Sequence, residues 1–259
     1  MASTLKIGDR NVGPGRPAYV IAEAGANHDR DLDVAHRLID VAAESKADAV
    51  KFQTYSAETL YSRFTPRISE MDEFGRSPAG ETPFELIKRI ELPREWQAEL
   101  RDHAVEKGLD FLSTPFDLEA VEELANLGVK AFKIASYELI DYDLLRAAAA
   151  HQRPMIVSTG NSNLADVELA VATVKEQGND QVVLLHCVSQ YPARFEDVNM
   201  RAMQTLAQAF DVPVGFSDHT MGYTAAVLAV GLGARCFEKH FTLDRTREGP
   251  DHPSALEPE

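Results

Sequence analysis

Short apolar segments of strand length recur along the chain, and helical patterns lie between most of them. The apolar segments are rich in β-branched and aromatic residues, which favour strands. Strands that alternate with helices indicate a parallel sheet. The eight predicted strands are Tyr19–Glu23, Ala49–Gln53, Asp110–Thr114, Ala131–Ser136, Met155–Ser158, Val182–His186, Val212–Ser217 and Arg235–His240.

The helical patterns carry their own end signals. Pro93 stands at a first-turn position, where proline is favoured, and Gly108, Gly128 and Gly178 each follow the last residue of a predicted helix. The predicted helices are Leu32–Ser45, Pro93–Lys107, Leu118–Leu127, Leu164–Gln177, Met200–Phe210 and Tyr223–Gly231.

The spacing of the strands predicts how they assemble. From Thr114 onward, the ends of successive strands are 22 to 31 residues apart, and the longer step from Gln53 to Thr114 contains an insertion at residues 54–91. Eight strands with this period predict a (β/α)8 TIM barrel, which uses about 250 residues. Thr4–Val12 and the Gly-Pro-Gly that follows predict a β-hairpin capping the barrel bottom. We therefore assign residues 1–17 to a hairpin cap and 18–259 to a TIM-barrel domain.

The end of the sequence does not complete the barrel pattern. The residues after His240 are rich in proline and acids and show no helical pattern, so a helix after the last strand is expected to be missing. Phe237 and Phe241, which alternate outward from that strand, would then be exposed. We expect this chain to be a fragment of a longer protein, or to associate through that apolar patch.

Composition excludes several classes of function. There are 26 Lys and Arg against 41 Asp and Glu, a net charge of −15, which repels nucleic acid and anionic lipid. No apolar stretch reaches the ~18 residues of a membrane-spanning helix, and the N-terminus has no apolar core of a secretory signal. Two cysteines suit a reducing compartment, so we expect a cytoplasmic protein.

Every predicted strand ends in polar or charged residues, and in a barrel these ends converge on the face that holds the active site. Side chains alternate along a strand, so Lys51 and Gln53 share one face, as do Glu238 and His240. These four residues and Lys133 are expected at the barrel mouth. Lys239 has the opposite parity and is expected to point outward and pair with an acid.

Lys51 and Lys133 are informative because the protein is so acidic. They could bind an anion such as phosphate or carboxylate, helped by the hydroxyl and backbone donors of the STPFD, KIAS and STG segments that begin at Ser113, Lys133 and Ser158. The alternative is that each lysine forms a buried ion pair with Glu23, Glu138 or Glu238.

Two of the eight histidines end neighbouring strands with inward parity. His219 and His240 could together bind one divalent metal ion and leave positions for water or substrate. The alternative is two independent hydrogen-bonding histidines. His186 has a simpler expectation, a hydrogen bond in the core.

The segments that carry these residues resemble the N-acetylneuraminate (sialic acid) synthase family over nearly the whole chain. They are IAEAGANH (Ile21–His28), KFQTY (Lys51–Tyr55), FLSTPFD (Phe111–Asp117), KIASYEL (Lys133–Leu139), STG (Ser158–Gly160), LLHCVSQYP (Leu184–Pro192), VPVGFSDHT (Val212–Thr220), EKHFTLDR (Glu238–Arg245) and GPDHPSALEPE (Gly249–Glu259). The resemblance implies a barrel enzyme that condenses phosphoenolpyruvate with an N-acetylated aldose to give a nine-carbon 2-keto acid.

The resemblance also implies roles residue by residue. His219 and His240 match the ligands of a divalent metal, Mn²⁺ or Mg²⁺, and Glu23 and Glu138 match the acid/base carboxylates. The positions that match sugar contacts are Gln53, Tyr191 and Asp251. Those that match phosphoenolpyruvate contacts are Lys51, Thr114, Lys133, Ser136, Ser158, Ser217 and Ser189, the last standing where many relatives carry Asn.

This chain departs from the family at its end. Ser254-Ala255-Leu256 stands where relatives more often have Ala-Ser before the leucine. Family members usually continue into a last barrel helix and an antifreeze-like domain, which supplies an arginine to the sugar site of the partner subunit, and both are absent from this sequence. We expect a homodimer. Three alternatives stay open: another phosphoenolpyruvate–aldose synthase, an aldolase that forms a Schiff base through Lys51 or Lys133, and a non-catalytic barrel that only binds anions.

Overall fold

The computed structural model describes residues 4–67 and 80–258, and its centre is a barrel of parallel strands. The sheet runs in the order β5-β4-β3-β10-β9-β8-β7-β6, and β5 and β6 at its two ends lie side by side, so the barrel is nearly closed. The strands are β3 (Tyr19–Glu23), β4 (Ala49–Thr54), β5 (Asp110–Pro115), β6 (Phe132–Ile134), β7 (Met155–Ser158), β8 (Val182–Cys187), β9 (Val214–Asp218) and β10 (Cys236–His240).

The eight predicted strands are confirmed, and three of them, β6, β9 and β10, are shorter than expected. Strand β9 begins at Val214 rather than Val212 because Pro213, which has no N–H, precedes it. Strand β6 ends at Ile134, so Ser136 lies in the following loop, where its hydroxyl accepts a hydrogen bond from Gly160 N at 3.0 Å. The (β/α)8 prediction therefore holds, and the difference at β6 brings two candidate site loops together.

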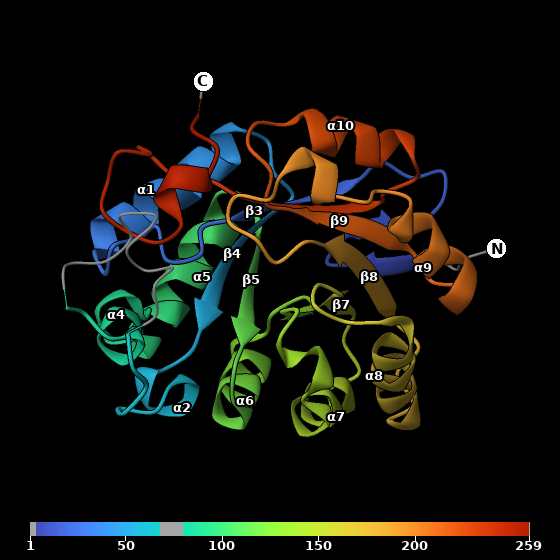
Figure 1. Cartoon of the computed structure of the whole chain (residues 1–259), viewed down its shortest axis with the longest axis horizontal. Helices are drawn as coiled ribbons and strands as arrows, with labels where there is room; N and C mark the ends of the chain where they lie inside the picture. Colours follow the sequence, from blue (N-terminus) through green and yellow to red (C-terminus); the bar gives the residue numbers. More distant parts are fainter. Residues whose placement is uncertain (1–3, 68–79, 259) are drawn as a thin grey trace.

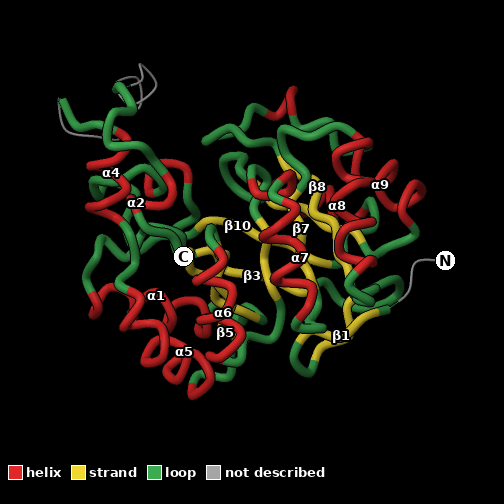
Figure 2. The backbone as a smooth tube through the Cα atoms, turned by 90° about the horizontal axis from the view of Figure 1, so that it is seen from below, coloured by secondary structure: helices red, strands yellow, loops and turns green. Residues whose placement is uncertain are grey.

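Helices surround the strands (Figures 1 and 2), and α6, α7 and α8 pack side by side along one side of the barrel. The helices of the barrel layer are α1 (Leu32–Glu44), α5 (Gln97–Glu106), α6 (Leu118–Leu127), α7 (Tyr142–Ala150), α8 (Leu164–Glu176), α9 (Ala202–Phe210) and α10 (Thr224–Gly231). Two further helices of the insertion, α2 (Ala57–Leu60) and α4 (Pro83–Ile90), lie at one side of the barrel. Residues 68–79 of the insertion lie outside the described residues. Within the described residues, no helix has both the length and the apolar character needed to cross a bilayer.

The predicted helices do not include α7. Its buried face consists of Leu144, Leu145, Ala148 and Ala149, which recur at the spacing of an amphipathic helix. The helix begins where the Asp141 carboxylate accepts a hydrogen bond from Leu144 N, a regular N-cap. Alanine is the strongest helix former, so propensity and the cap add to the amphipathic spacing of this helix.

The bottom of the barrel is closed by the predicted hairpin, β1 (Leu5–Ile7) and β2 (Arg10–Val12). Leu5, Ile7 and Val12 are buried in one cluster with inward-facing residues of the strands, among them Ile21 and Leu112. Burial of each such side chain contributes roughly 1.5–3 kcal/mol. The inner face of the barrel is therefore apolar at the hairpin end, which leaves its polar residues to the opposite, carboxyl end of the strands.

The expected exposure of Phe241 is wrong. Its side chain is buried because the last residues of the chain fold back over it: Phe241 pairs with Leu256, whose N–H donates to the His240 carbonyl at 2.9 Å. Phe237 is half-buried. The exposed apolar residues of this region lie instead on α10, where Val227 and Leu228 are 66% and 52% exposed.

Candidate active site

Lys51 lies at the carboxyl end of the barrel among side chains from three neighbouring strands. Its ammonium is 2.8 Å from Glu23 Oε2 on β3 and 3.7 Å from Glu238 Oε2 on β10, and it donates a hydrogen bond to Thr114 Oγ1 on β5 at 2.9 Å. Burial opposes the charged form of Lys51, but the two carboxylates outweigh it and raise its pKa. Lys51 is therefore held as a buried ammonium.

Lys133 occupies the matching position on the other side of Glu238. Its ammonium donates to Ser158 Oγ at 2.8 Å and to the Ile134 carbonyl at 3.0 Å, and it lies 3.6 Å from Glu238 Oε1. The same carboxylate oxygen accepts a hydrogen bond from Ser217 Oγ at 3.0 Å. Both lysines thus have carboxylate neighbours, as the ion-pair alternative requires, and both also contact hydroxyls that can help to bind an anion.

The sequence analysis places Glu238 at the mouth and names it only as one of three possible ion-pair partners of the lysines. The structure puts it between the two lysines, which outweigh the effect of burial and lower its pKa to about 2. Two buried lysines need a negatively charged side chain nearby. The sequence signal that identifies Glu238 as this side chain is that it lies on the same face of its strand as His240.

Glu23 is the other buried carboxylate of this cluster. Burial is the largest influence on it and raises its pKa, although Lys51 acts in the opposite direction. Gln53 donates a hydrogen bond to Glu23 Oε1 at 2.8 Å, and Oε2 receives no aligned hydrogen bond within the described residues. Glu23 and Glu238 therefore have pKa values shifted in opposite directions, which is a common arrangement of acid/base carboxylates.

The small residues of the neighbouring loops form a tight group beside Lys133. Gly160 N donates to Ser136 Oγ, and a Cβ at Gly160 would lie 2.8 Å from that hydroxyl and closer still to the hydroxyl of Ser189. A side chain at position 160 would therefore displace these two hydroxyls. Ser136 and Ser189, which two separate loops supply, therefore lie close together at Gly160, whereas Ser158 ends strand β7 and contacts Lys133.

The two candidate histidines face each other, with ring centroids 5.6 Å apart. His219 Nδ1 lies 2.8 Å from the Val188 carbonyl, a contact that assigns the proton to Nδ1 and leaves a lone pair on Nε2. Burial, with a smaller effect of His240, lowers the pKa of His219 to about 3. The ring of Tyr191 lies 4.0 Å from that of His219 and 5.7 Å from that of His240.

His240 is linked to the last loop of the chain. Its Nδ1 is 3.4 Å from Asp251 Oδ2, and this carboxylate outweighs burial and raises the pKa of His240. Asp251 also accepts a hydrogen bond from Ala26 N at 3.2 Å. Gly25 lies beside it with φ +52°, and a Cβ there would be 2.5 Å from the Asp251 carboxylate, so this contact needs glycine.

The donor set fits a divalent metal with two protein ligands. One imidazole is neutral and oriented by a carbonyl, and the other has a buried Nδ1 near a carboxylate, the outer contacts that metal-binding histidines usually have. Within residues 4–67 and 80–258, no group of three or more His, Cys, Asp and Glu side chains is placed to hold a metal ion. His219 and His240 would therefore leave most coordination positions to water or substrate.

Glu138 is separate from this cluster. It lies in a 3-10 turn (Glu138–Ile140) after β6, and no hydrogen bond or ion pair joins it to the other candidates in the part of the chain that the structure describes. Burial raises its pKa, and Lys133 is the nearest cation that acts against this shift. Its acid/base role stays a prediction.

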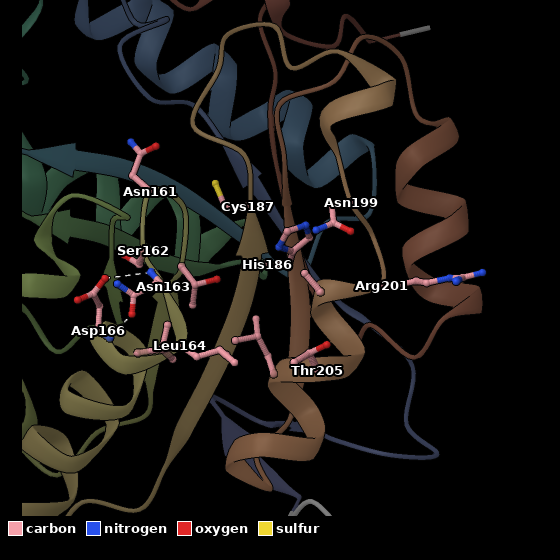
Figure 3. A pocket seen from close by; sticks show the side chains of 14 residues that line it. Asn161, Ser162, Asn163, Leu164, Asp166, His186, Cys187, Asn199, Arg201 and Thr205 are labelled. Carbon is pink, nitrogen blue, oxygen red and sulfur yellow. Dashed lines mark hydrogen bonds between the residues drawn. The ribbon is translucent and has the colours of Figure 1, made fainter.

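A cavity of about 730 Å³ adjoins the site without containing its charged residues. Figure 3 shows Asn161 and Ser162 of the loop after β7 on one side, Asn199 and Arg201 on the other, and His186 and Cys187 of β8 between them. His186 Nε2 contacts the Val198 carbonyl at 2.6 Å, the core hydrogen bond expected for it. The reactive groups thus lie inside the barrel mouth, and this cavity lies between α8 and α9 outside it.

A TIM barrel whose mouth holds buried lysines, buried carboxylates and paired histidines is a barrel enzyme by its fold and its site. Residues 38–259 match the model of the NeuB family, and the chain belongs to that family.

Relatives of the chain agree with this assignment. An uncharacterized protein of Methanocaldococcus jannaschii is 44% identical over 98% of this chain and 71% of its own length. The N,N'-diacetyllegionaminic acid synthase of Legionella pneumophila is 44% identical over the whole chain and 74% of its own length. The crystal structure of an N-acetylneuraminic acid (sialic acid) synthetase from Leptospira borgpetersenii, bound to citrate, superposes with a TM-score of 0.89 at 36% identity, covering 100% of this chain and 85% of that one. The chain is thus a synthase-type enzyme of the sialic acid synthase family.

Proposed function

We propose that the chain condenses phosphoenolpyruvate with the open-chain form of an N-acetylated aldose, giving a nine-carbon 2-keto sugar acid of the sialic acid type and phosphate. The observation that carries this proposal is the pair of buried lysines, Lys51 and Lys133, surrounded by hydroxyls in a protein of net charge −15. Such a protein attracts a multiply charged anion only through a local cationic pocket.

Phosphoenolpyruvate would bind across the two lysines. Lys133, Ser158 and the group formed by Ser136, Gly160 and Ser189 supply an ammonium and hydroxyl donors for its phosphate, and Lys51 with Thr114 supplies the same types of donor for its carboxylate. Ser217 lies between these groups, bonded to Glu238. Glu238 lies within 3.7 Å of both lysine ammonium groups and offsets their charge before the anion arrives.

In the proposed reaction, C3 of phosphoenolpyruvate forms a bond to the aldehyde carbon of the sugar, and the aldehyde oxygen takes a proton from the acid/base carboxyl group, Glu23 or Glu138, to become a hydroxyl. Positive charge develops at C2, where the carboxylates of Glu23 and Glu238 stabilise it. Water adds to C2 and loses one proton to that same carboxylate, Glu23 or Glu138. The bond between C2 and the phosphate oxygen then breaks, and the proton of the new C2 hydroxyl passes to the departing phosphate, which leaves the 2-keto group. General base catalysis of this kind typically contributes ~10²–10⁴-fold, and a base with a raised pKa such as Glu23 suits neutral pH.

The proposal includes a divalent metal, Mn²⁺ or Mg²⁺, held by His219 and His240. When bound, such an ion polarises the aldehyde oxygen of the sugar. Gln53, Tyr191 and Asp251 surround the two histidines and Glu23, which supports their assignment as sugar contacts.

The Schiff-base alternative is disfavoured by the state of Lys51. A lysine nucleophile must be neutral, and this one has a raised pKa between two carboxylates. Another phosphoenolpyruvate–aldose synthase differs from the proposal only in the sugar. We favour a 6-deoxy diacetamido aldose over N-acetylmannosamine, because the legionaminic acid synthase is the more similar of the two named relatives.

A panel of aldoses tests the proposal directly. With phosphoenolpyruvate and Mn²⁺, we expect phosphate release to depend on the added sugar and to be fastest with a 2,4-diacetamido-6-deoxy aldose. N-Acetylmannosamine and its 6-phosphate are the matched alternatives, and unacetylated mannose is the control. Phosphate release that is absent with every N-acetylated aldose, with phosphoenolpyruvate still binding in calorimetry, would favour the non-catalytic anion-binding barrel.

We further propose a homodimer, located in the cytoplasm. Large apolar side chains are exposed in loops that follow the carboxyl ends of β6, β8 and β9; Tyr137, Phe195 and Tyr223 are 67%, 55% and 64% exposed. Exposed apolar residues gathered on one face are typical of an interaction surface. Both cysteines are free, as in a reducing compartment.

Light scattering is expected to give the mass of a dimer at micromolar concentration. Replacing Tyr137 and Phe195 by serine is expected to shift the chain toward the monomer. A monomeric native chain would contradict this part of the proposal.

A further inference from the structure

Lys239 and Asp218 form a buried pair on the outer side of the strands that carry the two histidines. The Lys239 ammonium is 3.0 Å from Asp218 Oδ2 and 2.7 Å from the Thr220 carbonyl, and both side chains are almost completely buried. The expectation that Lys239 pairs with an acid is thus confirmed. Neither residue belongs to the cluster that contains Lys51 and Lys133.

The pair lies where the hydrogen-bonded ladder between β9 and β10 ends. Strands β9 and β10 are joined from Phe237↔Phe216 to Lys239↔Asp218, and the ladder ends there. His219 follows the last paired residue of β9, whereas His240 is paired with Glu23 on β3. The two histidines therefore belong to segments that no backbone hydrogen bond of the β9–β10 ladder connects.

Lys239 bridges this gap. Its ammonium contacts the Asp218 carboxylate and the Thr220 carbonyl, which belong to the residues on either side of His219. On its own strand, Lys239 directly precedes His240. The other carboxylate oxygen of Asp218 accepts hydrogen bonds from Thr220 N and Thr220 Oγ1, both at 2.8 Å. The short turn around His219 is thereby joined on both sides of the histidine to one side chain of β10.

We propose that Lys239, Asp218 and Thr220 are positioning residues that set the separation and orientation of the His219 and His240 imidazoles for a divalent cation. A buried ion pair is weak support for stability, since apolar side chains of similar volume often replace one without loss. A network that fixes the geometry of two metal ligands acts on metal affinity instead. Replacing the partners of metal ligands typically lowers the affinity for the metal by roughly 10–100-fold. The inference rests on the proposed metal role of the two histidines.

The test uses the double variant Lys239→Met with Asp218→Asn, which removes the pair without leaving a buried charge unpaired. Mn²⁺ affinity, measured by calorimetry on the full chain, is expected to fall roughly 10–100-fold. Binding of phosphoenolpyruvate without metal is expected to be unchanged, because Lys51 and Lys133 lie on other strands. Thr220→Val, which removes one hydroxyl, is the milder variant and is expected to weaken Mn²⁺ binding by a smaller factor.

A control separates positioning from general loss of stability. Tyr19 donates a hydrogen bond to Asp110 at 2.8 Å near the opposite end of the barrel. Tyr19→Phe is expected to lower the melting temperature and leave Mn²⁺ affinity unchanged. Mn²⁺ affinity that is retained in the folded double variant, or lost together with phosphoenolpyruvate binding, would overturn the inference. If the double variant does not fold, Thr220→Val is judged by the same two outcomes.

A second readout does not need the metal. The His219 Nδ1 proton that bonds to the Val188 carbonyl is expected to give a slowly exchanging imidazole N–H resonance in the native chain and in Tyr19→Phe. Its exchange is expected to accelerate in Thr220→Val and in the double variant. If the native chain binds no Mn²⁺, the metal part of the proposed function fails, and this resonance alone decides whether the network positions His219: unchanged exchange in both variants refutes it.

Discussion

Removal of divalent metal ions is expected to abolish turnover, and Mn²⁺ is expected to restore it. The physical reason is that His219 and His240 meet inside the barrel mouth as a neutral imidazole and a carboxylate-linked imidazole, with the proposed sugar contacts Tyr191 and Asp251 around them. The measurement is phosphate release after exhaustive chelation, followed by titration with Mn²⁺ and Mg²⁺. Full turnover in excess chelator would refute the metal assignment.

Variants of the histidines locate the effect. His240→Ala is expected to lower Mn²⁺ affinity by at least the roughly 10–100-fold that damage to a ligand's surroundings causes. His186→Gln is the matched control, since His186 is also buried at the end of a strand but bonds to the Val198 carbonyl on the outer side of the barrel. An equal loss of Mn²⁺ affinity in both variants would point to general disruption of the barrel rather than to a lost ligand.

The strands and their inward residues could be predicted from the sequence because the signal is local. Alternation along KFQ and EKH places Lys51, Gln53, Glu238 and His240 on the inner face, and the structure agrees. The roles could not all be predicted, because a role depends on neighbours that are distant in sequence. Glu238 acquires its role only because β6 and β4 place Lys133 and Lys51 on either side of it.

The features that the sequence analysis missed have physical causes of the same kind. Helix α7 is a different case, because its N-cap and the spacing of Leu144, Leu145, Ala148 and Ala149 are local signals that the analysis passed over. Phe241 is covered by Leu256, a contact between two loop segments that no periodicity encodes. The Asp251 contact with His240 likewise depends on a loop that returns to the segment after β3, where Ala26 N donates to Asp251. From the sequence, only the resemblance to a family identifies Asp251.

The second large effect is expected at Lys133. Its replacement removes a buried ammonium that contacts Ser158 and Glu238, and a hydrogen bond to a charged group contributes roughly 1.5–3 kcal/mol. Lys133→Ala alone would leave Glu238 with a single counter-ion, so the better variant is Lys133→Met with Glu238→Gln, which removes one charge of each sign. Phosphoenolpyruvate affinity in calorimetry is expected to fall about 10- to 150-fold, with a larger loss in kcat/KM because Glu238 also faces the reacting carbons in the proposed reaction.

The matched control for Lys133 is Lys130→Ala, three residues earlier and exposed near the start of the same strand. This variant is expected to bind phosphoenolpyruvate as the native chain does, because the charge of Lys130 is exposed to water and is far less effective than a charge inside the mouth.

Borohydride added to native enzyme with both substrates distinguishes an anion site from a covalent one. We expect full activity after the reagent is removed, since the lysines act as ammonium ions; irreversible inactivation would instead assign one of them as a Schiff-base nucleophile.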